Sequence, residues 1–105
     1  MLEIKEIPEN TSRLEVEVET VSTLAFSDVV IDVRSPDDAD RNPLKDLANP
    51  VITIPFYKVA SEFENLDDIK TYALYCDQGV MSLMQARELK EKGYHNVKVW
   101  RPEHS

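Results

Sequence analysis

The fold is decided by residues 71–82, which read Thr71-Tyr72-Ala73-Leu74-Tyr75-Cys76-Asp77-Gln78-Gly79-Val80-Met81-Ser82. The apolar first half of this segment is typical of a β-strand. It ends at Cys76, the single cysteine of the chain. Helix-forming residues follow, and Ser82 is the expected N-cap of their helix. We therefore predict a strand, a loop of residues 77–81 and a helix that stops at Gly93.

The predicted loop favours a negatively charged sulfur. The first N–H groups of a helix lack partners and carry partial positive charge, which stabilises a nearby anion. Free cysteine has a pKa of about 8.5, whereas thiols at helix N-termini have pKa values of roughly 3.5–7.5. Because Gly79 can adopt a positive φ, the loop N–H groups can also point inward around the sulfur. The pattern indicates a nucleophilic thiolate at Cys76; the alternative is a small buried side chain that ends a strand.

Two apolar segments upstream predict further strands. Residues 28–33 form a continuous β-branched run, typical of a strand buried on both faces of a parallel sheet. Residues 51–54 predict a second short buried strand, which Pro55 ends. Asp32 and Arg34 lie at the carboxyl end of the first strand, the edge where ligands bind in parallel α/β sheets. We expect these two side chains to form a structural pair that orders the following loop rather than to bind substrate.

The remaining segments complete an alternation of strands and helices. Residues 14–19 alternate apolar and acidic side chains, which predicts an edge strand with one wet face. Residues 20–27 carry a poor signal for a helical turn, and residues 37–49 are expected to form a loop with room for one turn of helix. Val97–Trp100 is the last expected strand. The sequence thus predicts an α/β domain whose mainly parallel sheet has about five strands, with helices on both faces. The helix expected after Pro55 has one apolar face, made by Phe56, Val59, Ala60 and Phe63.

Composition restricts the possible functions. The chain has 105 residues, which is the size of one domain. We expect this domain to span residues 14–105 and to follow a leader or interdomain linker of residues 1–13. The formal net charge of −8 argues against a surface that holds nucleic acid by itself. One cysteine excludes an internal disulfide and fits a reducing compartment. With no apolar run of about 18 residues and no signal-peptide pattern, we expect a cytoplasmic protein that does not contact a membrane.

Four segments together resemble the rhodanese domain family. The similarity runs from about residue 28 to residue 102. It is greatest to the C-terminal rhodanese-like domain of the tRNA 4-thiouridine sulfurtransferase family, whose members are also called thiamine biosynthesis proteins. The segments are Val30-Ile31-Asp32-Val33-Arg34-Ser35, Ile54-Pro55-Phe56-Tyr57-Lys58, the loop from Cys76 to Ser82, and Gly93-Tyr94-His95-Asn96-Val97-Lys98-Val99-Trp100-Arg101-Pro102.

This resemblance implies a rhodanese fold and a role in sulfur relay. Cys76 would take sulfane sulfur from a cysteine desulfurase, carry it as a persulfide, and pass it to tRNA 4-thiouridine, to the thiazole of thiamine, or to both. Adenylating and tRNA-binding domains, in the same or another chain, would complete tRNA thiolation. No cofactor or metal is implied, and Asp32 and Arg34 would support the site. The implied substrate-binding residues are Asp77, Gln78, Gly79, Val80, Met81 and Ser82.

Two positions depart from the family pattern, and two other functions are alternatives. Related domains commonly carry arginine where this chain has Gln78 and Leu83, which argues against small anionic donors such as thiosulfate. A phosphatase is disfavoured, because Met81 and Ser82 occupy the places after Cys76 where an arginine would close a phosphate-binding loop. The stronger alternative is a rhodanese-like module that binds a partner and does not use its cysteine.

Overall fold

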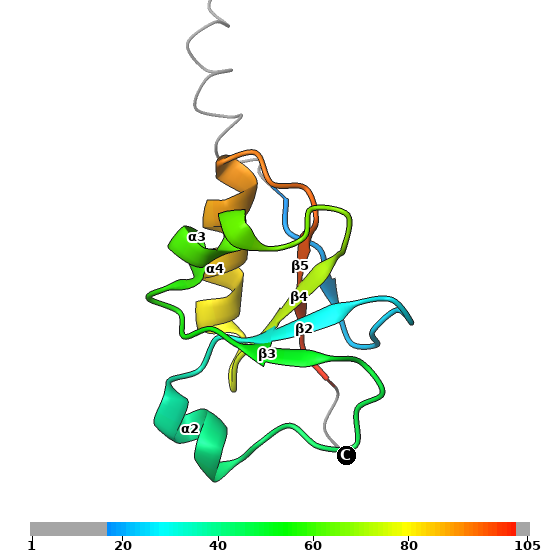
Figure 1. Ribbon diagram of the computed structural model, residues 1–105, viewed down its shortest axis with the longest axis vertical. Helices are drawn as coiled ribbons and strands as arrows, with labels where there is room; N and C mark the ends of the chain where they lie inside the picture. Colours follow the sequence, from blue (N-terminus) through cyan, green and yellow to red (C-terminus); the bar gives the residue numbers. More distant parts are fainter. Residues whose placement is uncertain (1–16, 103–105) are drawn as a thin grey trace, which may run out of the picture.

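Within residues 17–102, which the computed structural model describes, five strands form one sheet. Every neighbouring pair runs parallel, and the strand order is β1-β5-β4-β2-β3 (Figure 1). The predicted sheet of about five strands is therefore confirmed. The expected leader, residues 1–13, lies outside the described residues. The strands are β1 (Thr20–Val21), β2 (Val29–Asp32), β3 (Val51–Thr53), β4 (Tyr72–Tyr75) and β5 (Val97–Trp100).

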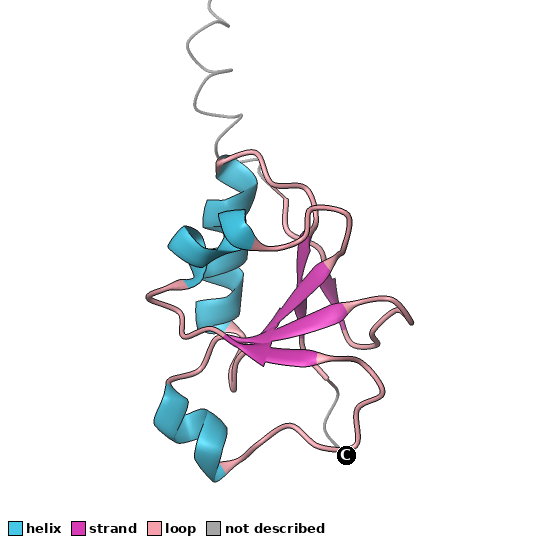
Figure 2. Cartoon of the chain, in the orientation of Figure 1, coloured by secondary structure: helices cyan, strands magenta, loops and turns pink. Residues whose placement is uncertain are grey.

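The same part of the chain contains three α-helices and one 3-10 helix. The helices α3 and α4 pack together beside the sheet, and α2 lies apart from them (Figure 2). None of these helices has both the length and the apolar composition needed to span a bilayer. Their bounds are α2 (Pro36–Arg41), α3 (Val59–Glu62), the 3-10 helix η1 (Phe63–Asn65) and α4 (Val80–Glu91).

The connections between strands cover both faces of the sheet. From β2 to β3 the chain moves in one direction along the sheet, whereas from β3 to β4 and from β4 to β5 it moves in the other. Right-handed crossovers therefore place α3 and α4 on one face and the α2 connection on the opposite face. The core agrees, because Ala86 and Leu89 of α4 pack into one cluster, whereas Leu44 and Leu47 pack on Val30 in the other. On the second face, residues after α2 fill the core, and α2 itself buries no side chain.

The neighbours β2 and β4 are the strands at which the direction of the connections reverses. In parallel α/β sheets this reversal opens a crevice beyond the carboxyl ends of the strands, where ligands bind. Asp32 of β2 lies opposite Tyr75 of β4, and the Val33 N–H donates to the Tyr75 carbonyl oxygen at 2.9 Å. The residues that come next, Arg34 and Cys76, are therefore brought to the same crevice.

The N-terminal edge strand lies later in the chain than predicted. Residues 14–16 of the expected strand are outside the described residues, residues 17–19 form no strand, and β1 occupies Thr20–Val21, where a helical turn was expected. The edge position itself is as expected, since β1 pairs only with β5. Alternation of apolar and acidic residues marks an extended segment with one buried side. Val18 does pack on the core, but the pairing with β5 starts after it.

Two other expectations about buried segments were wrong. The strand β3 was expected to be buried, yet it forms the opposite edge of the sheet and Val51 is 39% exposed. A three-residue apolar strand has the same sequence pattern at an edge as at the centre, so the pattern does not distinguish the two places. The helix after Pro55 is also shorter than predicted, because α3 starts at Val59 and Phe56 precedes it.

The end of α4 follows the prediction. Gly93 has φ of 101°, which glycine adopts without strain. Its N–H donates to the Lys90 carbonyl oxygen at 3.0 Å, and the Tyr94 N–H donates to the Leu89 carbonyl oxygen at 3.1 Å. This pair of bonds is a Schellman motif, which satisfies the last carbonyl groups of the helix.

A buried ion pair ties β5 to the turn before β2, and it gives a stability prediction. The Asp28 carboxylate is buried and accepts from Lys98 Nζ at 2.7 Å. Lys98→Met is expected to lower the free energy of unfolding by about 3 kcal/mol, because it leaves a buried charge without its partner. Lys92→Met is the control, since its exposed pair with Glu88 at 4.0 Å should contribute less than about 0.5 kcal/mol. Urea unfolding of both variants makes the comparison, and equal midpoints would contradict the prediction.

Candidate active site

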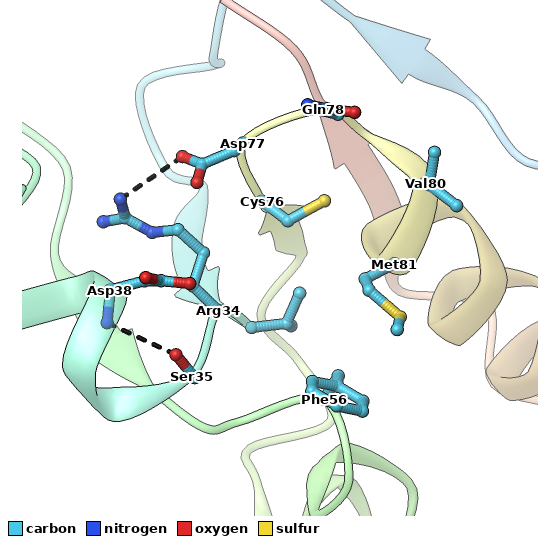
Figure 3. A pocket seen from close by; sticks show the side chains of 10 residues that line it. Arg34, Ser35, Asp38, Phe56, Cys76, Asp77, Gln78, Val80 and Met81 are labelled. Carbon is cyan, nitrogen blue, oxygen red and sulfur yellow. Dashed lines mark hydrogen bonds and ion pairs between the residues drawn. The ribbon is translucent and has the colours of Figure 1, made fainter.

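A pocket of about 500 Å³ opens beyond the carboxyl ends of β2 and β4 (Figure 3). This volume is in the range of sites that bind small molecules or a peptide side chain. The pocket lies where the sheet topology predicts a ligand crevice. It is lined by Val33, Arg34, Ser35, Asp38, Phe56, Cys76, Asp77, Gln78, Val80 and Met81.

The Cys76 sulfur is held by the start of α4. Its Sγ accepts from the Gly79 N–H at 3.1 Å and from the Ser82 N–H at 3.3 Å. The Ser82 Oγ lies 3.4 Å from the sulfur and donates to the Gly79 carbonyl oxygen at 3.3 Å. The side chain of Cys76 is largely buried but lines the pocket. Two backbone donors directed at one sulfur are the arrangement that stabilises a thiolate or a terminal persulfide anion.

The loop is shorter than predicted, and Ser82 is not the N-cap. Gly79 is the N-cap, with φ of 80°, and the helix begins at Val80. Ser82 therefore lies in the first turn, where its side chain is fully buried. Serine is a frequent N-cap residue, but glycine is also accepted there, and here only glycine fits the left-handed backbone. Starting the helix three residues earlier brings the Ser82 N–H to the sulfur.

The other predicted loop residues face the pocket. Asp77 points toward the opposite wall, and Gln78 lies at the top of the loop (Figure 3). Val80 and Met81, from the first turn of α4, present apolar side chains, and Val80 is 59% exposed. Gly79 and Ser82 contact the sulfur directly, so all six predicted residues, 77–82, lie around the Cys76 thiol.

Asp32 and Arg34 form a buried pair that joins three segments. Arg34 Nε donates to Asp32 Oδ1 at 2.9 Å and Nη2 donates to Oδ2 at 2.8 Å, with both side chains 3% exposed. This hydrogen-bonded partner raises the pKa of Arg34 above its usual value, so the guanidinium stays charged. The Arg34 guanidinium also donates to the Asn42 carbonyl oxygen at 2.8 Å and to Asp77 at 3.4 Å. It lies over the Tyr75 ring. The pair orders the loop after β2 and forms one wall of the pocket.

Several residues of the site were not predicted from the sequence. Ser35 caps α2 by accepting from the Asp38 N–H at 3.3 Å, and the Ser-Pro-Asp order was a recognisable helix start. Phe56 packs against the core as expected, and it also lines the pocket, which was not predicted. Arg101, after β5, packs its side chain against Gly79, and no local pattern indicates that contact. Across the described residues, no group of three or more His, Cys, Asp or Glu side chains could hold a metal ion.

Comparisons with known proteins agree with this geometry. The model of the rhodanese-like domain family matches residues 18–101. The chain is 52% identical over 101 residues to a tRNA sulfurtransferase of Yersinia pestis (strain Pestoides F), and equally to one of Yersinia pseudotuberculosis serotype O:1b (strain IP 31758). The alignment covers 96% of this chain but 21% of each relative. The chain thus spans about a fifth of the length of these curated relatives.

Solved structures share the fold. Reduced CoADR-RHD of Bacillus anthracis is 28% identical, with a TM-score of 0.60 over 93% of this chain and 14% of that protein. A rhodanese-related protein of Thermoplasma volcanium is 25% identical, with a TM-score of 0.58 over 72% of this chain and 71% of that one.

Proposed function

This chain belongs to the rhodanese-like domain family, and from that premise we propose that it is a sulfurtransferase domain that carries sulfane sulfur as a persulfide on Cys76. The observation that carries the proposal is the pair of N–H groups, from Gly79 and Ser82, directed at the sulfur. They stabilise negative charge on sulfur without a general base. The domain works within a larger enzyme, as its 21% share of the relatives' length suggests.

The chemistry is an exchange at sulfur. The Cys76 thiolate attacks the terminal sulfur of a donor persulfide, a new S–S bond forms, and the donor S–S bond breaks. The electron pair of that bond leaves with the donor sulfur as a thiolate, so no external oxidant or reductant is needed. The terminal sulfur on Cys76 then passes to an acceptor. The same loop N–H groups that held the thiolate offset the charge of the persulfide.

The pocket supports a protein-bound donor over a small anion. Asp38 and Asp77 bring negative charge to its walls, and Arg34 is already engaged by Asp32. A free dianion such as thiosulfate would meet this charge, whereas the apolar part of a protein persulfide side chain can lie against Val80. We propose that the donor is a cysteine desulfurase, the protein that the family resemblance implies.

The names of the relatives support tRNA as the final acceptor, since proteins that are 52% identical to this chain are tRNA sulfurtransferases. We propose that the sulfur goes to tRNA 4-thiouridine, to thiamine thiazole, or to both, as the family resemblance implies. With a net charge of −8, the domain is expected to bind RNA weakly by itself. Adenylating and tRNA-binding domains, in the same chain or another, hold the tRNA.

Intact mass spectrometry tests the proposal. After incubation with a cysteine desulfurase and cysteine, the chain is expected to gain about 32 Da, which a reductant removes and which Cys76→Ser lacks. No gain, together with slow alkylation of Cys76 at pH 6, would overturn the proposal. That outcome would favour a partner-binding module without sulfur chemistry. The exposed apolar side chains of Val80 and Met84 are the observation that favours such a module.

A further inference from the structure

We propose that Arg101 is a positioning residue for the sulfur-binding loop, acting through Gly79. Its side chain fixes the loop from outside the pocket and places a positive charge behind the sulfur. The role in sulfur transfer rests on the function proposed above. The contact between Arg101 and the loop is a separate observation.

The contact is close and anchored at both ends. A Cβ atom placed on Gly79 would lie 2.6 Å from Arg101 Nε and 2.7 Å from Arg101 Cδ, so the side chain occupies the space that only glycine leaves open. The Arg101 N–H donates to the Val21 carbonyl oxygen at 2.8 Å, which fixes its backbone to β1. The N–H of Gly79 in turn donates to Cys76 Sγ. Arg101 is therefore one residue away from the sulfur, with Gly79 between them.

Arg101 does not face the substrate. It is absent from the lining of the large pocket and instead lines a separate cavity of about 20 Å³, together with Cys76 and Asp77. A cavity of that size holds one water molecule and no substrate. Arg101 thus acts on the loop and not on the donor.

The charge of Arg101 is the second part of its role. Gln78 and Leu83 are uncharged, and Arg34, which also contacts the loop, is engaged by Asp32. A guanidinium is always protonated, so Arg101 keeps a positive charge beside Gly79 at every working pH. Because it acts from behind the loop, it does so without attracting anions into the pocket.

Substitutions that separate charge from packing test the inference. We measure the ratio of the Cys76 alkylation rate by iodoacetamide at pH 6 to the rate at pH 9, in the native chain and its variants. Arg101→Met keeps the length of the side chain and is expected to lower this ratio by about threefold to tenfold. Arg101→Lys should restore most of it. Arg87→Met, which removes an exposed arginine from α4, should leave it unchanged.

Salt concentration separates an electrostatic role from a structural one. At about 1 M salt the difference between the native chain and Arg101→Met should shrink, because charges are then screened within about 3 Å. An unchanged ratio in Arg101→Met, an equal loss in Arg101→Lys, or a loss that does not depend on salt would each overturn the inference. Urea unfolding confirms that each variant is folded.

Sulfur loading by the desulfurase, measured on the same variants, keeps the two proposals distinct. If the native chain takes up no sulfur while Arg101→Met still lowers the alkylation ratio, the proposed function fails and the role of Arg101 in the loop stands. If the native chain takes up sulfur and Arg101→Met matches it in loading and in alkylation, the role of Arg101 fails and the function stands.

Discussion

Replacing Gly79 with alanine is expected to slow sulfur loading of Cys76 by about 100-fold or more. The φ of 80° at Gly79 costs any other residue roughly 1–2 kcal/mol. The new methyl group would also lie 2.6 Å from Arg101 Nε, so the loop or the arginine must move. A movement of the loop would withdraw the Gly79 N–H from Cys76 Sγ, which it now meets at 3.1 Å. Loss of one such donor commonly costs about 100-fold to 1,000-fold in rate.

Gly93→Ala is the matched control. Gly93 also has a positive φ, of 101°, but a Cβ atom there would meet no atom within 4 Å. This variant should lose roughly 1 kcal/mol of stability from backbone strain and load sulfur at the native rate. The double variant Gly79→Ala/Arg101→Ala should recover part of the loading, because it removes the clash but keeps the strain. Native loading by Gly79→Ala would contradict the expected role of the loop N–H.

The centre of the fold was predictable because its signals are local. The strands β2 and β4 are mostly apolar, and both are followed by a polar loop and a helix, which is the pattern of a parallel sheet. The edges were harder to place. A short strand such as β1 takes its position from pairing with β5, which lies about 80 residues away in the sequence.

The site, too, has a part that local sequence predicts and a part that depends on the strand order. Residues 76–82 are contiguous, so one segment of sequence was enough to identify the thiol and the groups around it. The N-cap was misassigned because serine and glycine compete for that place, and the left-handed backbone of Gly79 decides between them. Phe56 and Arg101 reach the site from the ends of other strands. Their roles depend on the strand order, which no local pattern contains.

Replacing Arg34 with methionine is expected to lower the free energy of unfolding by about 3–5 kcal/mol. The change leaves the Asp32 carboxylate buried, with 3% of its side chain exposed and its two bonds from Arg34 lost. A buried charge without a partner is among the largest single-residue penalties. For a domain whose total stability is of the order of 5–15 kcal/mol, the variant should unfold at a much lower urea concentration.

Two comparisons establish that the cause is the buried charge. Arg41→Met removes an arginine whose pair with Asp38, at 3.5 Å, is exposed, and its stability should stay within about 0.5 kcal/mol of the native chain. Adding Asp32→Asn to Arg34→Met should recover part of the loss, since the amide carries no charge. Two results would contradict this explanation. One is that Arg34→Met unfolds at the native urea midpoint, and the other is that adding Asp32→Asn lowers the stability of Arg34→Met further. The same guanidinium also donates from Nη1 to Asp77 at 3.4 Å, so Arg34→Met removes one contact of the loop that carries the thiol as well.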